Sequence, residues 1–208
     1  MAATSGEIRK GRKFDQVLAG AREVFMRDGF DGANVDDIAR AAGVSKATLY
    51  SYFPDKRLLF SEVARMECDR QASAAMAVID PDAPVEASLT AIADRITRFF
   101  LSDFGQQIYR ICVAESHRFP ELGQRFYASG PQMLRQKLGA ILAGYVQRGA
   151  LRIDDIDMAA NQMAELCKSD LFSRRLCGVS DAVSEDDIAR VSSAAVAMFL
   201  ARYGAQGG

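Results

Sequence analysis

The sequence predicts an all-α protein built from two helical units that follow one another along the chain. Apolar side chains recur every three or four residues through most of the 208 residues, which is the spacing of one helix face. No segment keeps the alternation of apolar and polar residues that is typical of a half-buried strand. The clearest break is the proline-containing stretch 80–84, which separates a shorter first unit from a longer second one.

The expected elements follow from this spacing and from the residues that start and stop helices. The first helix covers Ile8–Asp28, with Phe14 and Phe25 on its apolar face and Gly29 as its stop. Two short helices follow within residues 34–53. The other expected helices are Pro54–Ile79, Val85–Leu101, Phe104–His117, Pro120–Arg148, Ile156–Leu176 and Ser184–Tyr203, about nine in all. Pro54 is expected in a first helical turn, where its missing amide is tolerated.

Residues 34–53 carry the most specific pattern in the chain. Asn34 is a good N-cap for a first short helix, and Gly43 stands where that helix should end in a residue with positive φ. Ser45 caps a second short helix, which turns Leu49 and Phe53 inward. Two capped amphipathic helices joined by a glycine turn form a helix-turn-helix.

The outward face of the second short helix is polar. Its residues are Lys46, Ala47, Thr48, Tyr50, Ser51 and Tyr52. A short helix that presents an ammonium group, hydroxyls and phenols suits phosphates and base edges in a DNA major groove. This segment therefore indicates DNA binding.

The residues in register extend this pattern. The run from Asp36 to Lys56, Asp-Asp-Ile-Ala-x-x-Ala-Gly-Val-Ser-Lys-x-Thr-Leu-Tyr-x-Tyr-Phe-Pro-x-Lys, resembles the signature of TetR-type transcriptional regulators. The resemblance implies a helix-turn-helix DNA-binding domain over 8–56, a connecting helix and break over 57–84, and an effector-binding and dimerisation domain over 85–204. The DNA-contacting residues that it implies are Asn34, Ser45, Lys46, Ala47, Thr48, Tyr50, Ser51, Tyr52 and Lys56, with Lys56 on a phosphate.

The second unit shows a resemblance of its own. The stretch Tyr109–Gly123, followed by Phe126 and Tyr127, resembles the C-terminal region of the AefR-like branch of the same family. Family members generally repress transcription and release DNA when a small molecule occupies this domain. The resemblance therefore implies a sequence-specific repressor that a small effector releases from its operator. The alternative is a helical adaptor that uses the hairpin to hold another protein.

The middle of the second unit concentrates aromatic and polarisable side chains, the kind that line ligand pockets. The candidate effector-binding residues are Phe100, Phe104, Tyr109, Glu115, His117, Phe126, Tyr127 and Met163. Glu115 and His117 would be polar anchors for a mostly apolar effector. Aromatic residues at helical spacing also complete cores, so that alternative stays open.

The last two expected helices combine apolar residues with small ones, including Val191 and Ala195. The family resemblance implies that these helices join two copies as a homodimer through a four-helix bundle. A dimer would read a near-palindromic double-stranded DNA operator, because one short helix covers only a few base pairs. The alternative is that these apolar faces complete the monomer's own core.

Composition argues against other classes of protein. The net charge of −1 gives no sign of a protein that coats nucleic acid indiscriminately. The four cysteines are scattered and there is one histidine, so no metal site is expected. No Walker loop, Gly-x-Ser-x-Gly elbow or dinucleotide-binding glycine motif occurs, and we expect neither enzymatic activity nor a cofactor. No stretch is apolar over the roughly 20 residues that span a bilayer, and no signal peptide is visible. A soluble cytoplasmic protein without a membrane partner is expected.

Overall fold

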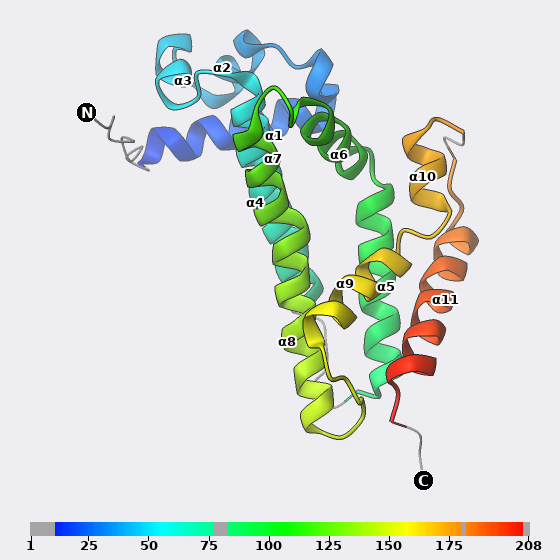
Figure 1. The fold of residues 1–208 in the computed structure, drawn as a ribbon. Coiled ribbons are helices and arrows are strands. Elements are labelled where there is room, and N and C mark those ends of the chain that lie inside the picture. Colours follow the sequence, from blue (N-terminus) through cyan, green and yellow to red (C-terminus); the bar gives the residue numbers. More distant parts are fainter. Residues whose placement is uncertain (1–10, 77–82, 180–181, 206–208) are drawn as a thin grey trace.

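A computed structural model describes residues 11–76, 83–179 and 182–205 of the chain. Every secondary-structure element in these ranges is a helix (Figure 1). An isolated antiparallel bridge joins Leu151 to Gly204. The prediction of an all-α protein is therefore confirmed. The expected helix start at Ile8 and the expected helix end at Ile79 lie outside the described residues.

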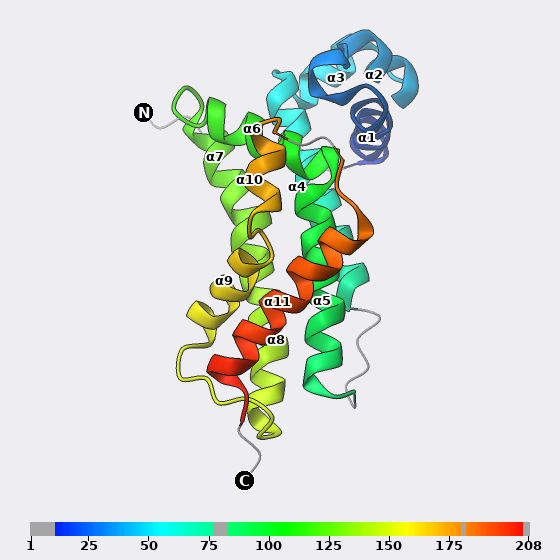
Figure 2. The same cartoon turned by 90° about the vertical axis from the view of Figure 1, so that its right-hand side faces the viewer.

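Three helices form a head at one end of the molecule. They are α1 (Arg12–Gly32), α2 (Val35–Ala42) and α3 (Lys46–Tyr52). Figure 2 shows them beside the upper end of the long helix α4 (Lys56–Met76). Their apolar faces meet around Phe25, Leu49 and Phe60, which are buried. Because a Cβ on Gly20 would lie 2.4 Å from the backbone nitrogen of Ala42, only glycine lets α1 and α2 approach this closely.

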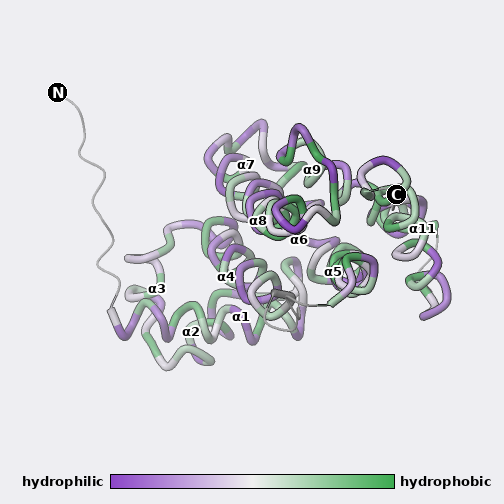
Figure 3. Tube along the Cα trace, turned by 90° about the horizontal axis from the view of Figure 1, so that it is seen from below, coloured by the Kyte–Doolittle hydropathy of each residue, from purple (hydrophilic) through white to green (hydrophobic). Residues whose placement is uncertain are grey.

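The second unit is larger and more open in its arrangement. Its elements are α5 (Val85–Leu101), α6 (Asp103–Glu115), α7 (Pro120–Tyr127), the π-helical segment η1 (Ala128–Gln132), α8 (Met133–Gln147), α9 (Ile156–Leu166), α10 (Leu171–Leu176) and α11 (Glu185–Tyr203). Seen from below in Figure 3, α4, α5 and α8 lie between the head on one side and α11 on the other. The expected bounds of α5 are confirmed.

The expected helix Pro120–Arg148 is present as a rod of three segments, α7, η1 and α8. Pro131 lies inside η1 and has no backbone amide to donate, so the regular hydrogen-bond pattern is interrupted there. The wider π turn accommodates one extra residue at this point. The rod therefore continues, but the face of α8 is rotated relative to that of α7.

The expected helix Ile156–Leu176 is wrong, because the structure has two helices in this range. α9 ends at Leu166, α10 begins at Leu171, and Asp170 between them has a φ of 61°. The change of direction lets α10 bury the side chains of Leu171 and Phe172. The apolar residues keep helical spacing across the whole segment, so the sequence pattern did not predict this break.

Two smaller boundaries also differ from expectation. α4 begins at Lys56, and Pro54 lies in the bend before it. The Asp55 carboxylate accepts the amide hydrogen of Arg57 at 2.7 Å and so caps the helix in place of the expected proline start. Gly29, the expected stop of the first helix, has a φ of 71° inside α1, and a last turn follows as far as Gly32.

The apolar interior contains two large clusters. One joins the head and α4 to α6 and α7, through residues that include Phe104, Ile108 and Leu122. The other lies among α5, α8, α9 and α11, around residues such as Leu142 and Phe199. The core of the head therefore extends into α6 and α7. A shift of these two helices would change the packing of the head.

Candidate functional site

The helix-turn-helix is built by local capping interactions. The Asn34 side-chain oxygen accepts the amide hydrogen of Asp37 at 2.8 Å, and the Ser45 hydroxyl accepts that of Thr48 at 3.1 Å. Gly43 has a φ of 63° and a ψ of 34°, the left-handed conformation that ends a helix. Asn34 and Ser45, expected at the DNA, are thus the N-caps of α2 and α3.

The outward face of α3 is only partly free. Lys46, Ala47, Tyr50 and Ser51 are exposed, and the Tyr50 side chain is 48% exposed. Tyr52 is half-buried and packs edge-on against Phe14, with ring centroids 5.6 Å apart. The residues available to a partner are therefore the first four, and Tyr52 contributes mainly to packing.

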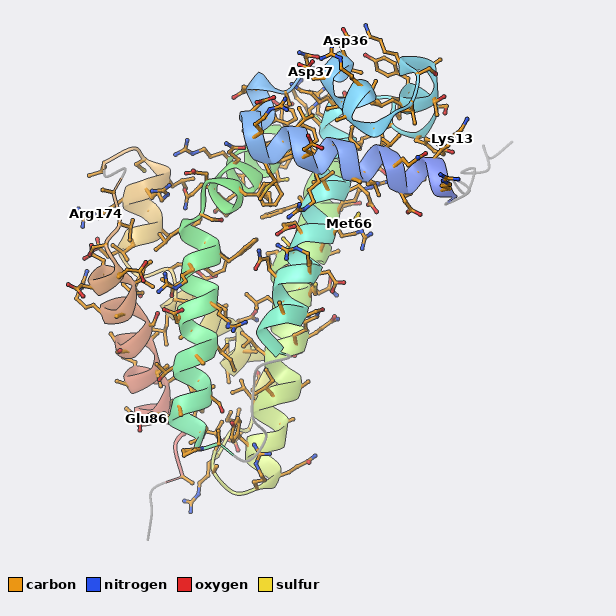
Figure 4. The ribbon with its side chains drawn as sticks, turned by 180° about the vertical axis from the view of Figure 1, so that it is seen from behind. Lys13, Asp36, Asp37, Met66, Glu86 and Arg174 are labelled. Carbon is orange, nitrogen blue, oxygen red and sulfur yellow. The ribbon has the colours of Figure 1, made fainter. Side chains whose placement is uncertain are left out.

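The single cation of α3 has an acidic neighbour. Lys46 Nζ lies 2.5 Å from a carboxylate oxygen of Asp36, and both side chains are more than half exposed. Figure 4 shows Asp36 and Asp37 at the outer end of the head, with Lys13 at the end of α1. An exposed pair of this kind contributes about 0–1 kcal/mol, so a phosphate could displace Asp36 from Lys46.

Lys56 has a different environment from the one expected. Its ammonium group donates to the carbonyl oxygens of Phe30 at 2.8 Å and Ala33 at 2.9 Å, and it lies 4.4 Å from the centroid of the Phe30 ring. A lysine ammonium has three donors, and two are committed here. Lys56 therefore fastens the start of α4 to the link between α1 and α2, and at most one donor remains for a phosphate.

An arginine directly after Lys56 ties the head to the second unit. The Arg57 guanidinium lies 2.6 Å from Asp55 and 2.8 Å from Glu115 at the end of α6, and its carbon lies 3.8 Å from the centroid of the Phe119 ring. The hydrogen bonds from Arg57 lower the pKa of the Asp55 carboxyl, and those from Asp55 and Glu115 raise the pKa of Arg57. We call Asp55, Arg57, Glu115 and Phe119 the junction clamp.

The junction clamp borders a groove of about 620 Å³ between the head and α6, which Tyr50 and Ile111 also line. Glu115, expected to anchor an effector, pairs with Arg57 at this junction, and its role toward an effector stays a prediction.

Three of the eight candidate effector residues meet in a row of aromatic rings. Tyr109 lies edge-on to Phe126, with centroids 6.2 Å apart, and to Phe172, with centroids 5.1 Å apart. Phe172 in turn lies 5.9 Å from Phe100. Phe172 was not among the expected residues, although it directly follows Leu171 as an apolar pair within the expected helix Ile156–Leu176. We call Phe100, Tyr109, Phe126 and Phe172 the aromatic row.

The other candidates are placed elsewhere. Phe104 packs against Phe60 of the head core, with centroids 6.0 Å apart, and Met163 is fully buried in the second cluster. Tyr127 is 56% exposed, and His117 is exposed beyond the end of α6.

A hollow of about 300 Å³ lies between α1, α4 and the start of α6, and Phe104 is the one candidate that lines it. Glu67 also lines it, with a side chain only 2% exposed that accepts hydrogen bonds from Arg22 at 2.9 Å, from Gln71 at 2.9 Å and from Arg70. Burial raises the pKa of Glu67, but the hydrogen bonds from Arg70, Arg22 and Gln71 lower it by more than burial raises it. The net result is a pKa of about 2. Glu67 is thus a structural anion held by two arginines.

Three of the four cysteines are buried, and Cys177 is exposed. Cys68, Cys112 and Cys167 are buried, and burial raises the pKa of each thiol to about 12. No group of three or more histidine, cysteine or acidic side chains in the described part of the chain could hold a metal ion. In the same residues, no helix is long and apolar enough to cross a membrane.

Two family models match the chain. Residues 17–63 match the model of bacterial regulatory proteins of the tetR family, and residues 87–205 match the C-terminal domain of AefR-like transcriptional repressors. The chain belongs to the TetR family. The resemblance found in the helix-turn-helix, and that to the AefR-like branch, are both confirmed.

Other TetR-family proteins are similar to this chain over parts of its length. The HTH-type transcriptional regulator RutR of Escherichia coli (strain K12) is 30% identical over 135 residues, which are 65% of this chain and 62% of RutR. The chain therefore spans less than two thirds of the length of RutR. The HTH-type transcriptional repressor AcnR of Corynebacterium glutamicum is 24% identical over 79% of this chain and 82% of AcnR.

Solved TetR-family structures share the fold. A transcriptional regulator of the family from Mesorhizobium loti has a TM-score of 0.82 at 26% identity, over 95% of this chain and 100% of that one. A protein named Flavonoid-responsive Regulator FrrA has a TM-score of 0.71 at 33% identity, over 95% of this chain and 100% of its own. A helix-turn-helix head on a helical C-terminal unit is thus the fold of this TetR-family chain.

Proposed function

We propose that this TetR-family protein is a sequence-specific repressor that binds a near-palindromic operator as a homodimer. The observation that carries the proposal is the capped helix α3 at the outer end of the head, with Lys46, Tyr50 and Ser51 exposed on its free face. Relatives named as transcriptional repressors support it. Such a repressor acts on the chromosome, and we expect it in the cytoplasm.

The dimer interface needs a different face of α11 from the one first expected. Val191 and Ala195 are 4% and 2% exposed, so they belong to the chain's own core. The opposite face of α11 is exposed and carries small residues and one methionine, with an arginine near each end: Ala189, Arg190, Ser193, Ala194, Ala197, Met198, Ala201 and Arg202. We propose that this small-residue face, in which Met198 is 63% exposed, packs on its symmetry mate.

The proposed effector is a small, mostly apolar molecule that binds in the second unit and lowers operator affinity. The half-buried side chains of the aromatic row support this chemistry. The name of the flavonoid-responsive relative supports an aromatic effector in particular. The junction clamp supplies a mechanical route, because Glu115 of α6 holds Arg57 next to the head.

A gel-shift assay with the DNA upstream of the protein's own gene tests DNA binding. Sequence-specific retardation is expected, and Lys46→Ala should weaken it and reduce the salt dependence by about one counterion, since an exposed cation is lost. Arg152→Ala removes the same charge from an exposed position between α8 and α9, and it should leave binding unchanged. No specific retardation on any neighbouring intergenic region would favour the helical adaptor.

Sedimentation tests the dimer. Met198→Glu places a charge on the exposed face of α11 and should give folded monomers with more than about 100-fold weaker operator binding, because two half-sites are no longer linked. Arg125→Glu, on the exposed surface of α7, is the control for a change of charge alone. A wild-type monomer at micromolar concentration that still binds tightly would contradict the proposal.

A further inference from the structure

The short helix α10 is bounded on both sides by residues with left-handed backbone. Asp170, just before it, has a φ of 61° and a ψ of −64°, and Gly178, two residues after it, has a φ of 68°. Asp170 is the single non-glycine residue with positive φ in the described part of the chain. The Leu171 amide donates to the Ser169 carbonyl at 2.7 Å, which makes a tight and strained γ-turn. Sharp turns at both ends thus set α10 apart from α9 and α11 as a separate short unit.

The ring of Phe172 occupies the centre of the aromatic row. It is 7% exposed and lies edge-on between Tyr109 of α6 and Phe100 of α5, at 5.1 and 5.9 Å between centroids. Lys168 Nζ stands 4.9 Å from the centroid of Phe100 and 5.8 Å from that of Phe172. Phe172 thus has the surroundings of a bound aromatic ring, namely two rings in edge-to-face contact and one cation.

Two kinds of contact hold α10 in place: Leu171 packs in a small buried cluster with α5 and α11, and polar contacts lie at the surface. The Arg110 guanidinium donates to the carbonyl oxygens of Arg175 at 3.0 Å and Leu176 at 2.9 Å, the free carbonyl end of the helix. Arg175 also pairs with Asp103 at 2.5 Å, and the Asp103 side chain is 86% exposed. Exposed polar contacts of this kind are individually weak, so moving α10 outward costs mainly the burial of Leu171 and Phe172.

We propose that α10 is a lid and that Phe172 is a plug, which a flat aromatic effector displaces from between Phe100 and Tyr109. Edge-to-face contacts favour a ring over a flexible alkyl chain, and Lys168 favours a phenolic or other electron-rich oxygen on that ring. The plug also explains why the aromatic row is gathered while the two hollows described above lie elsewhere.

The lid and the junction clamp share one helix. Asp103 and Arg110 of α6 hold α10, and Glu115 at the end of α6 holds Arg57 beside the head. Displacing the lid releases two contacts from α6 and leaves that helix free to shift at the clamp. The regulatory meaning of the lid rests on the proposed function, whereas ligand binding and lid movement do not.

Calorimetric titration with the flavone apigenin, and with decanoate as the aliphatic control, tests the ligand class. The wild-type protein should bind apigenin and not decanoate. Phe172→Ala should bind apigenin about tenfold or more tightly, because no ring has to be displaced. Phe199→Ala removes an equally buried ring from the other cluster and should not change apigenin affinity. Equal binding of the two compounds, or no binding of apigenin, would overturn the proposal.

Hydrogen exchange tests the movement without relying on a core variant. Apigenin should speed amide exchange in 171–176 of the wild-type protein, since the plug leaves its site, whereas a ligand that only packs against α10 would slow it. Arg110→Ala should speed exchange there without ligand, and Arg125→Ala, which removes an exposed arginine from α7, should not. Unchanged exchange in Arg110→Ala, or slowing by apigenin, would refute the lid.

The operator gel-shift separates the two proposals. If apigenin binds and opens the lid but no operator is bound, the lid proposal is supported and the repressor proposal is refuted. Operator binding together with failed apigenin and exchange results would do the opposite.

Discussion

The head and the second unit use aromatic rings in contrasting ways. In the core that the head shares with α4 and α6, Phe60 of α4 is fully buried and contacts Phe25, Phe30 and Phe104 at centroid distances of 5.0, 5.1 and 6.0 Å. In the aromatic row, three of the four rings are half-buried, and the fourth, Phe172, belongs to a helix bounded by left-handed residues. The same side-chain type therefore fixes the shape of one region and leaves the other able to rearrange.

The largest expected change in stability comes from comparing one aromatic residue from each region. Phe60→Ala should lower the free energy of unfolding by about 3–5 kcal/mol, because it leaves a cavity inside a closely packed core. Phe126→Ala should cost about 1 kcal/mol, since its ring is already partly in water. Chemical denaturation measures both values, and equal losses would remove the distinction between the two regions.

A smaller effect is expected from the buried anion between the head and α4. The folded-state pKa of Glu67, about 2, lies below its ordinary value of 4.5. Its contribution to stability is therefore present above about pH 4.5 and is lost as the pH falls toward 2. Glu67→Gln should lower stability by about 1–3 kcal/mol at pH 7 and flatten the acid dependence in this window.

The control for that pH profile is Glu121→Gln, because Glu121 pairs with Arg125 at the surface of α7 with a side chain 63% exposed. It should leave the acid dependence as in the wild type. A Glu67→Gln profile that runs parallel to the wild-type profile would show that Glu67 does not stabilise the join between α1 and α4.

The smallest effect belongs to the junction clamp. A thermal double-mutant cycle with Arg57→Ala and Glu115→Gln should give a coupling energy of about 0.5–1 kcal/mol, because both side chains are roughly three-quarters buried. The Arg125–Glu121 pair, more exposed and confined to one helix, should give a smaller value. A coupling no larger than that of the control pair would show that the clamp does not join the head to α6.

The local features of the head could be predicted from the sequence because they depend on a few neighbouring residues. Asn34, Gly43 and Ser45 each act within three or four positions, and the structure has the caps and the left-handed turn that they predict. The outward residues of α3 follow from the same short-range spacing. Their contacts with DNA remain predictions.

The contacts that the sequence did not reveal depend on partners that are distant along the chain. Lys56 reaches the carbonyls of Phe30 and Ala33, and Glu115 reaches Arg57, because tertiary packing brings these segments together. The break at Asp170 has a similar cause, since it allows Phe172 to contact Tyr109 and Phe100. Helical periodicity alone does not encode such pairings.

The π turn at Ala128–Gln132 has a consequence for how this chain can vary. α7 directs Leu122 into the cluster shared with the head, whereas α8 directs Leu138 into the other cluster. One residue more or less in a helix rotates everything beyond it by about 100°. The extra residue in the π turn thus sets the rotation of α8 relative to α7, so that each helix faces its own core. A one-residue deletion there would turn the apolar face of α8 toward water. Length variation in this rod is therefore far less tolerable than in the loops at its ends.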